Sequence, residues 1–73
     1  MLEVGQVLTL EDENQYAVID VFAKNEITYV YLVDLNNMAN FMYAKLNGVT
    51  IEELTDVDEI KMVVEIVNKN IHS

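Results

Sequence analysis

Two neighbouring segments, Gln15–Ala23 and Ile27–Asp34, carry apolar side chains on both faces and constrain the fold more than any other feature. Side chains of a strand alternate between the two faces of a sheet, so strands that are apolar at odd and even positions predict burial on both faces. The chain offers one amphipathic helix, which covers only one of these faces. The other face must therefore curl closed or meet a partner.

Turn signals divide the first 54 residues into about five expected strands. The first strand covers residues 6–10, and a polar turn at residues 11–14 separates it from the second. Lys24, Asn25 and Glu26 form a short hairpin loop before the third strand, because asparagine tolerates the left-handed conformation that such loops need. Strict alternation then predicts two faces for the second strand, interrupted by Asp20. One face carries Ala17, Ile19, Val21 and Ala23, and the other carries Tyr16, Val18 and Phe22.

Asparagine-rich turns shape the rest of the sheet. Three asparagines between residues 35 and 40 favour a turn before the fourth strand, at about 41–46. The dipeptide Asn47–Gly48 predicts a type I′ hairpin turn, because both central positions of that turn need a positive φ. It leads to a partly polar edge strand at Val49–Leu54, anchored by Val49 and Ile51.

The apolar period changes from two to 3.6 residues near residue 56, which predicts a helix over about 56–70. Thr55 or Asp56 is expected as the N-cap, with Asp58 or Glu59 completing a near capping box. The apolar stripe consists of Val57, Ile60, Val64, Val67 and Ile71, widened by Val63. We therefore expect one α+β domain over residues 1–73: an antiparallel meander of about five strands over residues 6–54, bent or closed like a small SH3-like barrel, with one C-terminal helix.

The charge excludes several partners. The formal charge of −9 comes from 13 acidic residues against four lysines, with −6 in residues 1–36 (seven acids, one lysine) and −3 in residues 37–73 (six acids, three lysines). Such a field repels phosphate, so direct binding to nucleic acid or to an anionic membrane is not expected. The chain has no cysteine, no basic leader and no run near the ~18 apolar residues of a spanning helix. We expect a cytoplasmic protein.

No constellation of residues predicts catalysis, a cofactor or a metal site. The acids Asp56, Asp58 and Glu59 lack the glycine and the regular oxygen spacing of a calcium loop, and helix capping accounts for them better. The acids of residues 11–13 form a solvated turn. His72 is the only histidine and stands one residue from the end of the chain, too few groups for nucleophilic or metal-dependent chemistry. We therefore expect a protein that is not an enzyme.

The aromatic residues have two interpretations. Aromatic side chains on adjacent strands usually pair in a core, and tyrosine also suits a half-wet recognition face. The candidate interaction face consists of Tyr16, Phe22, Tyr29 and Tyr31. We expect a non-catalytic protein-interaction module that self-associates as a homodimer if the sheet stays open, whereas a closed barrel would bury these residues within one monomer. The alternative function is an acidic regulator or inhibitor that imitates nucleic acid on a basic protein surface. Apolar association should survive high salt, and charge mimicry should not.

One resemblance concerns the first half of the chain. The residues that carry it are the opening run from Val4 to Val18, with its glycine-led strand, acidic turn and tyrosine-bearing strand, and the later run Thr28–Asp34. In these runs the chain resembles small, acidic, uncharacterised β-rich proteins of low-GC Gram-positive bacteria and their mobile elements. The resemblance implies a shared domain without an assigned activity, and it transfers no functional residue.

Overall fold

A five-stranded antiparallel sheet and one helix make up the protein, in a computed structural model that describes residues 2–10 and 13–72, apart from the side chain of His72. The elements are β1 (Val7–Thr9), β2 (Gln15–Lys24), β3 (Ile27–Asp34), β4 (Phe41–Asn47), β5 (Thr50–Glu53) and α1 (Val57–His72). Consecutive strands are neighbours throughout the sheet, which makes it a meander. The expected α+β fold is confirmed. Two acids of the turn at 11–14, Glu11 and Asp12, lie outside the described residues.

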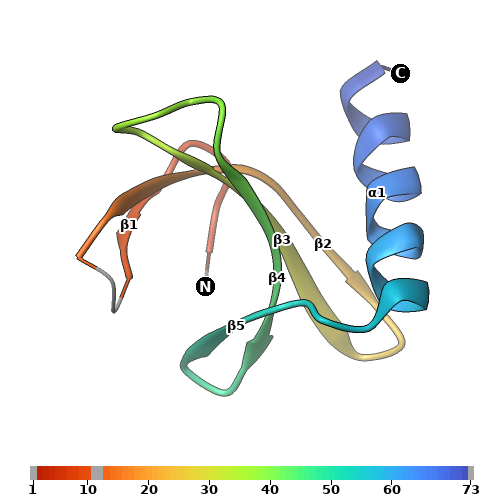
Figure 1. Cartoon of the computed structure of the whole chain (residues 1–73). Helices are drawn as coiled ribbons and strands as arrows, with labels where there is room; N and C mark the ends of the chain where they lie inside the picture. Colours follow the sequence, from red (N-terminus) through yellow and green to blue (C-terminus); the bar gives the residue numbers. More distant parts are fainter. Residues whose placement is uncertain (1, 11–12, 73) are drawn as a thin grey trace.

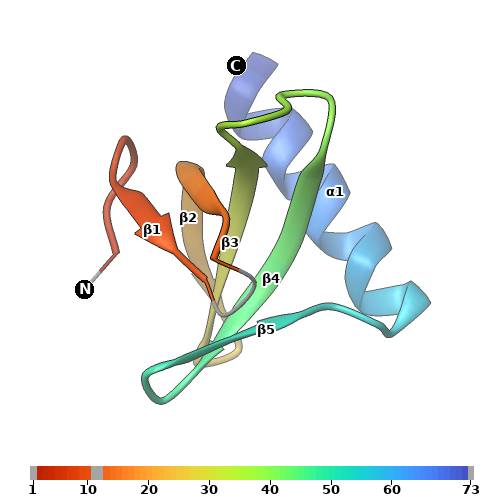
Figure 2. The same ribbon diagram turned by 60° about the vertical axis from the view of Figure 1, so that its left-hand side comes forward.

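The sheet curls into an open half-barrel, and α1 lies against its outer, convex side (Figure 1). After a turn of the molecule, the end strands β1 and β5 come forward, with α1 behind the sheet (Figure 2). Within the described part of the chain, β1 pairs only with β2 and β5 pairs only with β4. The curl therefore brings the two ends of the sheet round without joining them.

The inner face of the curl forms the first core. Val18, Val30, Leu32 and Ala44 are buried there, together with Tyr16. The partly buried residues around them are Leu2, Leu8, Leu10, Val21, Met42 and Ile51. Curling thus buries within one chain the sheet face that the helix leaves uncovered.

A second core lies between α1 and the outer face of the sheet. Its buried members are Tyr29, Leu54, Val63 and Val67, and its partly buried members are Phe22, Ile27, Tyr31, Tyr43, Ile60 and Met62. The expected apolar stripe of the helix is partly wrong. Val57 and Ile71 are exposed and Val64 is half-buried, because the sheet covers only the middle turns of α1, around Val63 and Val67.

A β-bulge in β2 corrects the expected faces of that strand. Val18 pairs with Leu32, but the next pair along is Asp20 with Tyr31, so Ile19 is an extra residue. Beyond the bulge the alternation is reversed. Val21 therefore joins the inner core with Tyr16 and Val18, and Phe22 lies on the helix side. The bulge also bends the strand, as a curled sheet requires.

The two tight hairpins differ from each other. In the β2–β3 turn both central residues, Asn25 and Glu26, have positive φ (54° and 67°), as in a type I′ turn. In the β4–β5 turn the expected position is wrong by one residue. Asn47 pairs with Thr50, so Gly48 and Val49 are the central residues, and only Gly48 has a positive φ (64°), as in a type II′ turn. Val49 consequently projects into solvent and anchors nothing.

Candidate interaction surfaces

The structure divides the four aromatic residues of the expected interaction face between two cores. Tyr16 lies in the inner core, on the opposite side of the sheet from the other three. Tyr29 is 3% exposed and packs under α1, with the Phe22 ring stacked on it at a centroid distance of 5.4 Å. Tyr31 lies half-buried on the same outer face. These four side chains therefore do not form one continuous exposed surface, and the helix already covers part of their area.

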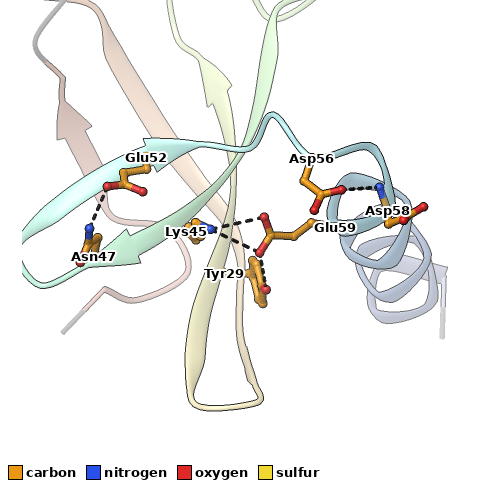
Figure 3. Close-up of polar contacts among 7 residues, drawn as sticks. All are labelled: Tyr29, Lys45, Asn47, Glu52, Asp56, Asp58 and Glu59. Carbon is orange, nitrogen blue, oxygen red and sulfur yellow. Dashed lines mark hydrogen bonds and ion pairs between the residues drawn. The ribbon is translucent and has the colours of Figure 1, made fainter.

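Glu59 anchors the first turns of α1 to the sheet (Figure 3). The Tyr29 hydroxyl donates a hydrogen bond to Glu59 Oε2 at 2.8 Å, and Lys45 Nζ lies 3.4 Å from Glu59 Oε1. Tyr29 and Lys45 are cross-strand partners on β3 and β4, so one carboxylate holds both strands. Burial, then the hydrogen bond to Glu59 and the negative charge of Glu59, raise the pKa of Tyr29 above its ordinary value of 10.0.

The start of the helix uses the expected cap without the expected box. Asp56 is the N-cap, because its Oδ1 accepts the Asp58 backbone N–H at 2.9 Å and its carbonyl accepts the Ile60 N–H at 2.9 Å. Glu59 stands three residues after the cap but turns toward the sheet instead of back to Asp56. Among the described residues, no group of three or more acidic, histidine or cysteine side chains is arranged to hold a metal ion.

Near the other end of α1, Asn70 Nδ2 donates to Asp20 Oδ2 at 2.9 Å, while Asp20 Oδ1 accepts the Val21 N–H. Polar contacts thus tie the helix to the sheet at both ends and apolar packing holds its middle. The helix-covered area is consequently not a free surface for a partner.

Exposed apolar side chains occur at the end of the sheet where β3 turns into β4. Tyr31 and Tyr43 stack at 5.0 Å, and the Phe41 ring meets both edge-on at 5.9 and 5.5 Å. Phe41 is 56% exposed, and in the connection just before it Leu35 is 42% and Met38 is 73% exposed. We call this set the tip patch: Leu35, Met38 and Phe41 with the half-buried Tyr31 and Tyr43.

Side-chain hydrogen bonds hold the β3–β4 connection in one shape. The buried Asp34 accepts the Asn36 N–H at 2.8 Å, and Asn37 Oδ1 accepts the Ala39 N–H at 3.2 Å. The Asp34 N–H in turn donates to the Asn40 carbonyl. These are the turns that the asparagines of this segment favour. The exposed side chains of the tip patch are therefore presented by an ordered connection.

The interaction face expected from the aromatic residues does not include Leu35, Met38 and Phe41, which are exposed. A signal was present in the sequence: residues 35–44 form its longest stretch without an acidic or basic side chain. The chain has 13 acids and four lysines among its 73 residues, so a stretch of this length without a charged side chain stands out from the rest of the sequence.

A second surface lies between the two ends of the sheet. There an open groove of about 460 Å³ separates β1 from β5. Its lining combines apolar side chains with two threonines and one charged residue, Glu53. We call it the edge groove; it is lined by Leu8, Thr9, Leu10, Met42, Thr50, Ile51 and Glu53, and the exposed Val49 of the β4–β5 turn stands at its rim.

No helix in the described part of the chain is both long enough and apolar enough to cross a membrane. The chain matches no protein-family model, no curated protein and no solved structure.

Proposed function

We propose that this chain is a non-catalytic protein-interaction module that self-associates through the tip patch. The observation that supports the proposal is the exposure of Met38 and Phe41 (73% and 56%) within a stretch that has no charged side chain. Exposed apolar side chains that gather in one place mark interaction sites more often than scattered ones do.

The composition of the tip patch is that of an interface centre. Aromatic residues and methionine are enriched at the core of protein interfaces, and lysine, glutamate and aspartate are depleted. The patch contains two tyrosines, a phenylalanine and a methionine, and none of the depleted residues. Because the tyrosine and phenylalanine rings already contact one another, they lose little side-chain freedom when a partner covers them.

A second copy of the chain suits this patch for an electrostatic reason. Two copies that each carry −9 repel one another, so they approach most easily where neither surface carries a charge. A two-fold symmetric dimer brings identical patches together, and an uncharged patch then faces an uncharged patch.

Sedimentation equilibrium of the wild type and of Phe41→Glu tests the proposal. We expect the wild type to dimerise in the micromolar range and Phe41→Glu to stay monomeric, because the new carboxylate would be buried without a partner. The matched control is Val57→Glu, which adds the same charge at an exposed position (63%) in the first turn of α1 and should leave the dimer intact. The helical circular-dichroism signal should be unchanged in both variants. A wild type that is monomeric at every concentration up to millimolar would exclude self-association, and equal loss in both variants would place it elsewhere.

A further inference from the structure

The edge groove lies between two strand edges that have no strand partner among the described residues. On β1, the Val18 N–H donates to the Gln6 carbonyl at 2.8 Å, which shows that Gln6 faces β2. Alternate residues of an antiparallel strand bond to the same neighbour. The peptide groups of Val7 and Thr9 therefore point away from β2, toward the open end of the sheet.

The same reasoning applies to β5 on the other side of the groove. The Leu54 N–H donates to the Tyr43 carbonyl at 3.0 Å, so Leu54 faces β4. By alternation, the peptide groups of Ile51 and Glu53 point away from β4. Both walls of the groove thus offer backbone donors and acceptors that only another extended chain satisfies in register.

The side chains around the groove define the chemistry of such a segment. Leu8, Leu10, Met42 and Ile51 are half-buried and supply apolar contacts below the groove. Glu53 is exposed in its wall, and the exposed Glu13 stands in the turn that follows β1. Lys45, by contrast, is engaged with Glu59 on the outer face. Ile51 and Glu53 stand two residues apart, so they lie on the same face of β5. An occupant should therefore carry, on the face that it turns into the groove, apolar side chains against Leu8 and Ile51 and a basic side chain beside Glu53.

We infer that the edge groove binds an extended, basic segment of a partner protein, which adds between β1 and β5 as a sixth strand and closes the half-barrel. The end strands have three and four residues, so the segment pairs over about three or four residues, or roughly 10–13 Å of extended chain. This inference goes beyond the proposed self-association, because it uses a different surface and holds whether or not the chain is dimeric.

The test uses a capped synthetic peptide of about eight lysine and valine residues, ordered so that one face of the extended chain carries both valine and lysine, and long enough to span the groove. Binding to the full chain is followed by fluorescence anisotropy and by NMR shifts of backbone amides. We expect saturable binding with the largest shifts at Val7, Thr9, Ile51 and Glu53. The same peptide with alternate backbone nitrogens methylated should bind about tenfold more weakly, because it loses strand hydrogen bonds. Equal affinity of the two peptides would overturn strand addition.

A charge-reversal pair separates the groove from the general acidic field. Glu53→Lys and Glu65→Lys change the net charge equally, and both residues are exposed, one in the groove wall and the other on α1. Glu53→Lys should weaken the lysine–valine peptide roughly fivefold, while Glu65→Lys should have little effect. An equal effect of the two would mean that the peptide is drawn by net charge alone, which would overturn the site.

Repeating the titration with monomeric Phe41→Glu distinguishes this inference from the proposed dimer, because groove binding should persist in that variant. Loss of peptide binding there would place the peptide at the tip patch.

Discussion

A hydrogen bond from the Tyr29 hydroxyl joins the sheet to α1. The hydroxyl donates to the Glu59 carboxylate, and the tyrosine ring is buried between the sheet and α1. Both features favour the neutral phenol, so the pKa of Tyr29 is raised above 10.0 in the folded state. Between the unfolded and the folded pKa, the unfolded chain has lost this proton and the folded chain still holds it. The contribution of Tyr29 to the free energy of unfolding is therefore fully present below pH 10, and it is lost as the pH rises through the raised pKa of the folded state.

This linkage yields a prediction for urea unfolding between about pH 8 and about pH 11. Tyr29→Phe should lower the free energy of unfolding by about 1–2 kcal/mol at neutral pH, through loss of the hydrogen bond, and should flatten its decline above pH 10. Glu59→Gln retains an acceptor but removes the charge, so its decline should be intermediate, because burial of the phenol remains. A decline equally steep in the wild type and in Tyr29→Phe would show that other groups govern the alkaline limit.

At the scale of elements, the strands and the helix followed from periodicity and turn residues, but the phase of β2 did not. The hydrophobic pattern of β2 cannot reveal a bulge, because both faces of the strand are apolar. A shift by one position then replaces one apolar residue with another. Phe22 was therefore assigned to the wrong face, and the interaction face was expected to be continuous. The β4–β5 turn was displaced for a similar reason, since glycine suits either the first or the second central position of a tight turn. The role of Glu59 depends on a tyrosine 30 residues away, which local capping patterns do not include.

The helix provides the prediction at this scale. Val63 is fully buried against Leu54, Val67 and the sheet, whereas Val57 in the same helix is 63% exposed. Val63→Asp should cost about 3 kcal/mol or more and should unfold much of the population of so small a domain. Val57→Asp should change the free energy of unfolding by about 0.5 kcal/mol or less. Thermal melts followed by circular dichroism compare the two, and a Val63→Asp variant that melts with the wild type would mean that α1 does not hold the sheet.

For the whole molecule, net charge and apolar surface act in opposite directions. The negative charge opposes every contact between copies, while the tip patch favours one such contact by removing apolar surface from water. Within a copy, the Glu59 carboxylate pairs with Lys45 and accepts the hydroxyl of Tyr29 at the edge of the second core.

The last prediction follows from this opposition. Screening of two copies at −9 weakens their repulsion but leaves apolar contact intact, so the dimer dissociation constant should fall severalfold as salt rises from about 0.05 M to about 0.5 M. Sedimentation equilibrium across this range measures it, with Phe41→Glu as the control that stays monomeric throughout and excludes general salting-out. A dimer that weakens with salt would instead require attraction between opposite charges, which the uncharged tip patch does not supply, and the interface would have to lie on one of the charged surfaces.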